Sequence, residues 1–337
     1  FFTGAIGLVF GLGIDPQIVV EVLYRSMDKF ALVVVMFFIL CGNIMTKGSI
    51  VKKLINVANV MVGFLPGGLA MAGVLACGFF GAISGSTVAT VVAIGGFMIP
   101  ALLENSYDEQ FSVGIMTTAP ILGVIIPPSI AMILYAMVSN DQLEALFLTG
   151  FIPGIMIIMA MSIYAYLVCK KAGMKRRHRP TPREALTVLK ESAWALFLPV
   201  LIFGGIYSGL FTANEAAVVA CFYAFCVELC IHKDMKLRDI KPTIVSSAIT
   251  SATLLVIVAG ASVFGEYLTF EQIPGKIASV VVENITSPVV FLLSVNVLLL
   301  IIGMFMDIIS ATLILTPIFL PLLEKFGVNT MHFGLLM

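Results

Sequence analysis

The stretch GAISGSTVATVVAIGGFMIP (81–100), followed after a short polar turn by FSVGIMTTAPILGVIIPPSIAMILYAMVSN (111–140), decides the fold. Each part is an apolar segment interrupted near its middle, the first at 84–87 and the second at 123–129. Pro127 and Pro128 lack an N–H, and a proline inside a helix clashes with the preceding turn. In lipid every backbone polar group needs a partner, so broken helices persist only inside protein or beside a watery cavity. Two neighbouring breaks at membrane depth therefore predict a binding site.

The composition indicates an integral membrane protein. Of 337 residues, 60% are hydrophobic and 11% are charged, with a mean hydropathy of +1.10, whereas a soluble domain carries about 25% charged residues. The apolar runs have helix length, without the short alternating segments of a barrel, so we predict an all-α polytopic membrane protein. A net charge of zero gives no support for nucleic-acid binding. No nucleophile–base constellation, phosphate-binding loop or metal-ligand spacing indicates an enzyme.

The apolar pattern also predicts the order of the elements. The first run is shorter than the roughly 20 residues of a span, so we expect part of its helix to precede Phe1. The segment 47–63 mixes Lys with apolar residues at helical spacing, which favours a helix lying in the membrane interface. The arms on either side of Ser84-Gly85-Ser86 are too short for comfortable spans, which favours a re-entrant hairpin over 68–103. Further helices are expected at 30–46, 111–138, 144–169, 193–210, 213–232 and 245–268, and a second broken element at 288–323, interrupted near Met306-Asp307.

An internal repeat links the two broken elements. The recurring residues are Gly42, Thr46 and Lys53, shifted by 223 positions, and Gly81, Ala89, Thr90, Phe97 and Phe111, shifted by 222. Because the shift is nearly constant and both copies carry a break, we favour a true repeat over chance. Five crossings are expected between the repeat starts, an odd number, so the second copy is predicted to be inverted.

Charge predicts the topology. If both broken elements turn back on themselves, the loops 47–53, 170–190 and 233–241 fall on one side. These loops hold three, eight and four of the 19 Lys and Arg residues, so the positive-inside rule places them in the cytoplasm. His178 and His232 lie in the basic loops and are expected to be solvated.

The first pair of breaks offers the oxygen ligands of a cation site. Ser84, Ser86 and Thr87 supply hydroxyls, and Gly85 lets the backbone turn and come close. Free carbonyls at 123–128, with the negative ends of half-helices, can replace the water shell of a cation. Neither break contains a carboxylate, which suits Na⁺ better than Ca²⁺. The alternative interpretation of the small residues is close helix packing.

Polar residues elsewhere have simpler interpretations. Asp307 at the second break is costly at membrane depth and is interpreted as functional, unless it lies near the interface. Asn43 and Asn296 are expected to form hydrogen bonds between helices. Thr212-Ala-Asn-Glu215 predicts a capping box.

Five stretches together resemble the large membrane subunit of tripartite ATP-independent periplasmic (TRAP) transporters, and the resemblance extends over nearly the whole chain. They are GAISGSTVATVVAIGGFMIP, GVIIPPSIAMILYAMVS, GIYSGLFTANEAAVVACFYA (205–224), LLSVNVLLLIIGMFMD (292–307) and LTPIFLPLLEKFGVNTMHFG (315–334). The resemblance implies a Na⁺-driven importer with an elevator-type transport domain in the bacterial inner membrane, with Na⁺ as coupling ion and no other cofactor. It also implies a periplasmic binding protein and a small four-helix membrane subunit, separate or fused, as partners. Substrates would be small organic acids of the sialic acid or C4-dicarboxylate class.

The resemblance also implies site residues and domains. The expected Na⁺ and substrate site comprises Ser84, Gly85, Ser86, Thr87, Thr90, Gly123, Ile126, Pro127, Pro128 and Ser129, with Na⁺ held through Ser84, Ser86, Gly123 and Ile126. A pseudo-symmetric second site would comprise Gly303, Met306, Asp307 and Thr312. The expected segments are scaffold and arm helices (1–66), the first hairpin with the broken helix of the transport domain (67–140), connecting helices with basic loops (141–244), a scaffold helix and arm (245–287) and the second hairpin (288–337).

One departure and two alternatives stand beside this interpretation. Members of the family have a second Pro-Pro break after the HFG block, which would fall beyond Met337. A stand-alone Na⁺-coupled dicarboxylate carrier would share the paired hairpins but need no binding protein. A channel or membrane scaffold is the alternative from another class.

Overall fold

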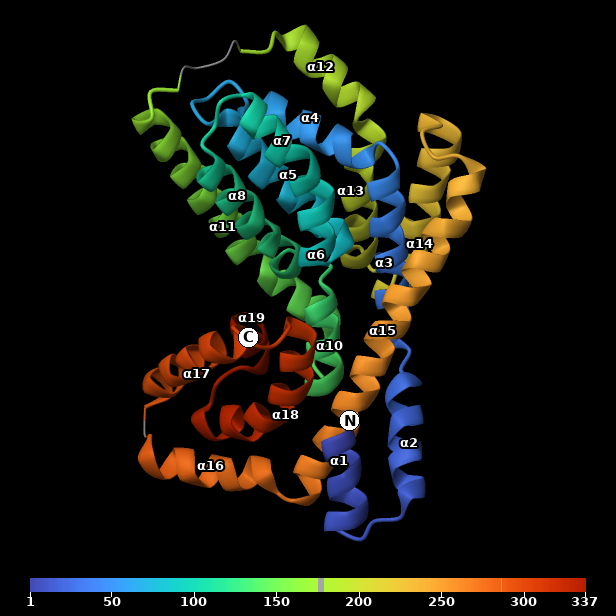
Figure 1. Cartoon of the computed structure of the whole chain (residues 1–337), viewed down its shortest axis with the longest axis vertical. Helices are drawn as coiled ribbons and strands as arrows, with labels where there is room; N and C mark the ends of the chain where they lie inside the picture. Colours follow the sequence, from blue (N-terminus) through green and yellow to red (C-terminus); the bar gives the residue numbers. More distant parts are fainter. Residues whose placement is uncertain (175–178, 286) are drawn as a thin grey trace. The chain divides into compact units, whose positions relative to one another are not determined.

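The computed structural model describes residues 1–174, 179–285 and 287–337, and within these ranges every regular element is a helix (Figure 1). His178 lies outside the described residues. The chain divides into two compact units. Unit 1 contains residues 1–35, 131–149 and 249–337, and unit 2 contains residues 36–130 and 150–248.

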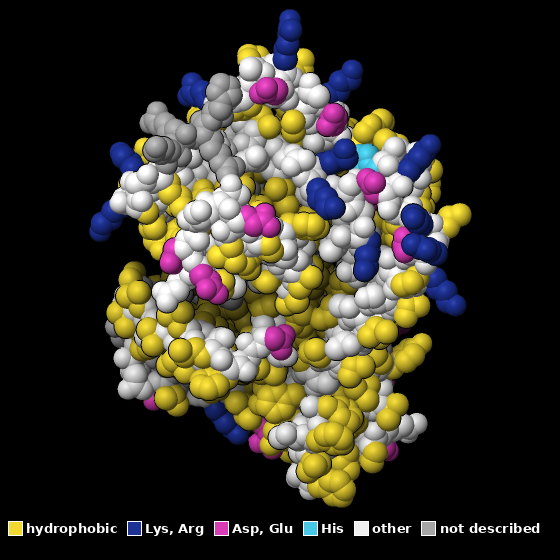
Figure 2. Space-filling view, turned by 45° about the horizontal axis from the view of Figure 1, so that its top comes forward, with side chains coloured by type: hydrophobic (Ala, Val, Ile, Leu, Met, Phe, Trp, Pro, Cys, Tyr) yellow, Lys and Arg dark blue, Asp and Glu magenta, His cyan; other side chains and the backbone are white. Residues whose placement is uncertain are grey.

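Helix length and composition confirm an all-α polytopic membrane protein. Among the described residues six helices are long and apolar enough to cross a membrane, or up to eight if two bent pairs each count as one span. Figure 2 shows broad areas of hydrophobic side chains on the face in view, as expected for surfaces that meet lipid. The six are Thr87–Glu104, Glu109–Ser139, Leu143–Lys171, Ala213–His232, Leu237–Phe270 and Ile308–Phe326.

The first broken element in unit 2 is a helical hairpin, as predicted. The helix α5 (Gly68–Ser84) ends at Gly85, which has a left-handed φ of 60° that glycine adopts without strain. Ser86 caps the start of the return arm, which consists of α6 (Thr87–Thr90), a π-helical turn and α7 (Gly96–Glu104). A Cβ on Gly73 would lie 3.2 Å from Met98 Cε. These two residues are almost equally far from Gly85 in the sequence, so the two arms of the hairpin lie against each other.

The second broken element of unit 2 is a helix interrupted by its two prolines. It comprises α8 (Glu109–Thr118), the 3₁₀ turn 119–121, α9 (Leu122–Ile125) and α10 (Ile130–Ser139), whose residues after Ile130 belong to unit 1. Ile126 is extended, with φ −81° and ψ 122°. Since Pro127 and Pro128 have no N–H, they cannot donate to the carbonyls of Gly123 and Val124, one turn earlier. The predicted break is therefore confirmed.

The remaining helices of unit 2 correct two loop predictions. They are α3 (Ala31–Lys47), α4 (Ile50–Val62), α11 (Leu143–Lys171), α12 (Pro182–Glu191), α13 (Ala193–Tyr207), α14 (Ala213–Cys226) with a π-helical end at 227–232, and α15 (Leu237–Phe270), of which α3, α11 and α15 continue into unit 1. The prediction of a basic loop at 170–190 is wrong for α12, which has Pro182 at its start and a Thr181–Glu184 capping box. The loop predicted at 233–241 is likewise wrong from Leu237, where α15 begins.

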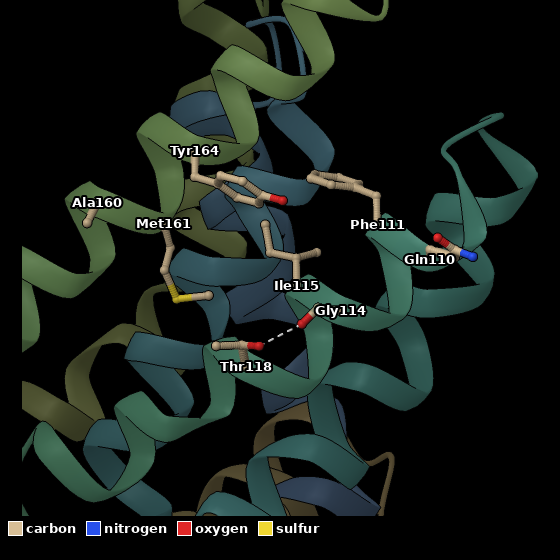
Figure 3. A pocket seen from close by; sticks show the side chains of 8 residues that line it. All are labelled: Gln110, Phe111, Gly114, Ile115, Thr118, Ala160, Met161 and Tyr164. Atoms are coloured by element: carbon tan, nitrogen blue, oxygen red, sulfur yellow. Dashed lines mark hydrogen bonds between the residues drawn. The ribbon is translucent and has the colours of Figure 1, made fainter. Parts of the chain in front are cut away.

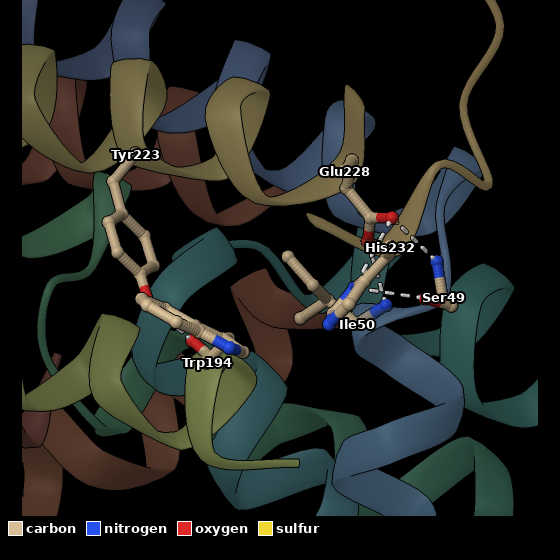
Figure 4. A network of polar contacts seen from close by, with 6 residues as sticks. All are labelled: Ser49, Ile50, Trp194, Tyr223, Glu228 and His232. Atoms are coloured by element: carbon tan, nitrogen blue, oxygen red, sulfur yellow. Dashed lines mark hydrogen bonds and ion pairs between the residues drawn. The ribbon is translucent and has the colours of Figure 1, made fainter. Parts of the chain in front are cut away.

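A buried carboxylate anchors α4 (Figure 4). Glu228 is fully buried, and its Oε1 and Oε2 accept the N–H groups of Ile50 (2.8 Å) and Ser49 (3.1 Å) at the start of that helix. His232 Nδ1 lies 3.1 Å from Ser49 Oγ, and its side chain is only 6% exposed. The prediction that His232 is solvated is therefore wrong, because the start of α4 covers it.

The same contacts bring the basic segments together within unit 2. The segment 47–53 meets 228–232 through Glu228, and Ser192 Oγ donates to the carbonyl of Lys53 (3.4 Å). Arg179 stacks on the Phe64 ring at 4.8 Å from its centroid. These contacts agree with a common side for the three basic segments, and the cytoplasmic assignment stays a prediction.

Two of the smaller polar predictions are confirmed and one is wrong. Asn43 Nδ2 donates to Ser247 Oγ (2.8 Å), which joins α3 to α15. Thr212 and Glu215 form the expected capping box at the start of α14. Asn296 instead donates to the carbonyl of Leu292 (3.0 Å) in its own helix, because a carbonyl one turn back lies within reach of its side chain.

Unit 1 contains the second hairpin. Its own helices are α1 (Phe2–Ile6), α2 (Pro16–Met27), α16 (Ile273–Asn284), α17 (Pro288–Gly303), α18 (Ile308–Phe326) and α19 (Thr330–Leu336). The rings of Phe291 and Phe326 are stacked with centroids 4.4 Å apart, which joins the start of α17 to the end of α18. The chain therefore turns back between Gly303 and Ile308, as predicted.

The two copies of the repeat match in helix bounds and in a hydrogen bond. α4 starts at Ile50 and α16 at Ile273, while α7 ends at Glu104 and α18 at Phe326. Thr90 Oγ1 donates to the carbonyl of Ser86, and Thr312 Oγ1 donates to the carbonyl of Ile308, both at 2.7 Å. The inversion of the second copy and its assignment to domains stay predictions.

The Glu228 anchor predicts a stability effect. Glu228→Ala leaves two N–H groups at the buried start of α4 without their acceptor, so we expect a loss of about 3 kcal/mol. Thermal unfolding of the purified protein in detergent measures it. Glu184→Ala, which removes the exposed capping box of α12, is the matched control and should shift the midpoint less. Equal shifts would contradict the anchoring role.

Candidate functional site

The tip of the first hairpin lies in the Gly123–Ser129 break of the interrupted helix that begins with α8, within unit 2. The carbonyl of Gly85 accepts the N–H of Ile130 (3.2 Å), the first residue after the break. A Cβ on Gly85 would lie 2.6 Å from the carbonyl oxygen of Pro128. A Cβ on Gly81 would lie 2.7 Å from Gly123 Cα. The predicted residues of the two breaks are thus brought together, and glycines allow the backbones to touch.

Hydroxyl and carbonyl oxygens cluster at this contact. Ser84 Oγ lies 3.3 Å from Thr90 Oγ1, which donates to the carbonyl of Ser86 (2.7 Å). Gly123 lies against the Thr90 hydroxyl and the Ser86 carbonyl. A Cβ on Gly123 would be 2.8 Å from Thr90 Oγ1 and 3.0 Å from Ser86 O. Ser84, Thr90 and Ser129 are buried, whereas Thr87 is partly exposed.

The ends of four helical segments converge here, which sets the local electrostatics. α5 and α9 end at this point, and their terminal carbonyls make a weakly negative end. The return arm of the hairpin and α10 begin here, and the positive ends of their helix dipoles make a weakly positive end. The same region can therefore favour a cation on one side and an anionic group on the other.

The sequence around the tip carries no formal charge. The ranges 54–103 and 110–140 contain neither acidic nor basic residues. A cation at the tip would be bound by neutral oxygens alone. Ca²⁺ sites usually include several carboxylates, so this ligand set does not suit Ca²⁺.

The tip of the second hairpin in unit 1 is built differently. Asp307 caps α18: Oδ2 accepts the N–H groups of Ile309 (3.0 Å) and Ser310 (3.2 Å), and Oδ1 accepts the Ser310 hydroxyl (2.6 Å). Gly303 and Asp307 are exposed, Met306 is partly exposed, and Thr312 is buried. Asp307 thus has a structural role as a helix cap beside any role in binding.

A groove in unit 2 lies apart from the predicted residues (Figure 3). It has a volume of 490 Å³ and lies between α8 and α11. Tyr164 and Phe111 flank it with ring centroids 6.2 Å apart. Its lining is Gln110, Phe111, Gly114, Ile115, Thr118, Ala160, Met161 and Tyr164, none of which belongs to a predicted site.

One side-chain cluster in unit 2 has the composition of a metal site. Glu228, His232 and Asp234 offer ligand atoms within 4.8 Å of one another. Both oxygens of Glu228 already accept N–H groups of Ser49 and Ile50. We therefore assign this cluster to anchoring α4.

Two glycines of the site were not among the residues predicted for it. Gly81 approaches Gly123, and Gly42 of α3 lies against the hairpin, since a Cβ there would be 3.3 Å from Ser84 Cβ. Both residues belong to the repeat, and small residues facing a break are the sequence signal for their contact role.

A polytopic all-α protein with two hairpins and an interrupted helix packed on one of them has the architecture of a secondary transporter. The model of the family described as "Tripartite ATP-independent periplasmic transporter, DctM component" matches residues 2–337. The chain belongs to this family, and the resemblance to TRAP large membrane subunits is confirmed.

Three relatives illustrate the family. The C4-dicarboxylate TRAP transporter large permease protein DctM of Pseudomonas aeruginosa is 40% identical over 94% of this chain and 74% of its own length. The protein of the same name from Rhodobacter capsulatus is 39% identical over 93% of this chain and 74% of its own length. The isethionate TRAP transporter permease protein DctMQ of Oleidesulfovibrio alaskensis is 39% identical over 95% of this chain, which spans 50% of that relative.

The glycine contacts at the tip predict a packing effect. Gly123→Ala places a methyl group against Thr90 and Ser86, and we expect a loss of about 1–3 kcal/mol in stability from overpacking. The control is Gly114→Ala, where a Cβ meets nothing within 4 Å and the better helix propensity of Ala should be neutral or stabilising. Thermal unfolding compares the two, and a neutral Gly123→Ala would show that the tip does not pack as described.

Proposed function

We propose that this chain is the permease component of a Na⁺-coupled importer of small organic anions. The observation that carries the proposal is the packing of the Ser84–Ser86 tip into the Gly123–Ser129 break. The break exposes backbone oxygens where the tip supplies hydroxyls, and the surroundings are uncharged. Na⁺ would be held by Ser84 and Ser86 from the hairpin and by the carbonyls of Gly123 and Ile126 from the break.

The substrate would bind beside the ion. The positive dipole ends at the starts of the return arm and of α10 favour an anionic group, and a Na⁺ held by neutral oxygens adds a full positive charge. The relatives named for C4-dicarboxylates and isethionate suggest a carboxylate or sulfonate on a small molecule. Gly303, Met306, Asp307 and Thr312 form the pseudo-equivalent second site in this proposal.

The transport cycle would couple ion and anion through electrostatics. An anion at a neutral tip is disfavoured until the cation is present, so the two bind together. Movement of the hairpin with its partner helix as one body, the elevator mechanism, would then carry both across the bacterial inner membrane. A periplasmic binding protein would deliver the substrate, and a small membrane subunit, separate or fused, would brace the scaffold helices.

The function is tested by uptake of labelled organic anions in cells that express the gene with its small subunit. We expect uptake in Na⁺ medium but not in K⁺ medium, and only with the cognate binding protein. Ser86→Leu removes a hydroxyl at the tip and should abolish Na⁺-dependent uptake and Na⁺-dependent thermal stabilisation in a folded protein. Ser279→Leu, on exposed α16, is the matched control. Na⁺-driven uptake without a binding protein would favour a stand-alone carrier, and high conductance in electrical recording would favour a channel.

The cytoplasmic side of the basic segments is tested by thiol labelling. A cysteine at Lys171, exposed at the end of α11, should react with an impermeant reagent only from inside the cell. A cysteine at Leu210, 74% exposed between α13 and α14, should react from outside. Cys230 is exposed and is first replaced by Ala. The reverse pattern would overturn the proposed orientation.

A further inference from the structure

The helix α12 has four chemically distinct sides. Successive residues of an α-helix lie about 100° apart around its axis. Ala185 and Val188 share the side that continues to Ser192, whose hydroxyl donates to the carbonyl of Lys53 in α4. α12 packs against α4, so this side, on which Ala185 and Val188 are half-buried, is partly covered by protein.

The next side of α12 is apolar and uncovered. Pro182, Leu186 and Leu189 lie on it, and Leu186 is 68% exposed and Leu189 41% exposed. No residue of α12, all of which the structure describes, is buried. α4 is also amphipathic, but its apolar side is buried against protein, through Ile50, Val51, Leu54, Val57 and Ala58. Protein packing therefore explains the amphipathic pattern of α4 and leaves that of α12 unexplained.

Charge is ordered around the same helix. Arg183 and Lys190 flank the apolar row on one side, three and four residues from Leu186. Glu184 and Glu191 lie roughly opposite the row. An apolar row, a basic flank and an acidic side away from the row form the order expected for a helix at a membrane surface.

The residues that follow α12 locate this surface. α12 and α13 are joined at a bend of 61°, and α13 with α12 has the length and composition of a bent span. Trp194, the single tryptophan of the 337 residues, stands just after this bend and is 47% exposed. Its carbonyl accepts the Tyr223 hydroxyl (2.9 Å), which ties the corner to α14 (Figure 4). Tryptophan favours the membrane–water interface, so the corner marks headgroup level.

We infer that α12 is a binding surface for anionic phospholipid. Leu186 and Leu189 insert between acyl chains, while Arg183 and Lys190 contact the lipid phosphates. The covered side of α12 packs against α4. Lipid bound to α12 therefore contacts a helix that supports α4, and α4 directly precedes the first hairpin. The occupant is a lipid surface rather than a protein, because the acidic side faces away from the apolar row and the interfacial tryptophan lies at the same level.

Tryptophan fluorescence in nanodiscs tests this inference. In a Trp194→Phe background, Leu186→Trp should be quenched at least twofold more by acyl-brominated lipid than Thr187→Trp, which lies one residue on and away from the apolar row. Circular dichroism and gel filtration confirm that both variants are folded. Equal quenching at the two positions would overturn the insertion of α12.

A second quenching experiment tests the preference of α12 for anionic lipid. For Leu186→Trp we expect stronger quenching by brominated phosphatidylglycerol than by brominated phosphatidylcholine at the same fraction. Adding Arg183→Gln and Lys190→Gln should remove this preference while the quenching by phosphatidylcholine stays. Equal quenching by both lipids before the charges are removed would refute a site for anionic lipid. Loss of all lipid quenching on addition of a soluble protein partner would assign the surface to that partner instead.

Discussion

A proline has no N–H to donate, and two in succession leave two carbonyls of the preceding helical turn without their usual partners. In a membrane this loss must be compensated within the protein. In unit 2 the tip of the first hairpin lies in this gap, and the carbonyl of Gly85 accepts the N–H of Ile130, the first residue of α10 after the break. The glycines at 81 and 123 allow the backbones to meet, and the hydroxyls of Ser84 and Thr90 fill the remaining space.

The sequence predicted these features because their causes are local. Glycine and proline breaks, apolar runs of limited length and a constant shift between copies can all be recognised without knowledge of contacts. α12 was not predicted because a basic composition is typical of a solvated loop, although Thr181 and Glu184 form the same capping signal as Thr212 and Glu215. The burial of His232 could not be predicted, since it depends on α4, which is remote in sequence.

The two hairpins share a backbone plan but differ in chemistry at their tips. The first turns through Gly85 and Ser86, is uncharged and is largely buried against the proline break. The second turns through residues that end at Asp307, which carries a carboxylate and stabilises the start of α18. The two hairpins thus share a buried threonine hydrogen bond, while the capping group is a hydroxyl in the first and a carboxylate in the second.

The double-proline break has a consequence for the energetics of ligand binding. The carbonyls of Gly123 and Val124 are available because of covalent structure, and no rearrangement of the backbone can supply the missing donors. Their oxygens therefore do not have to be released from other bonds each time a ligand arrives, and the reorganisation energy of that step is small. A site of this kind therefore needs little rearrangement of its backbone to accept a ligand.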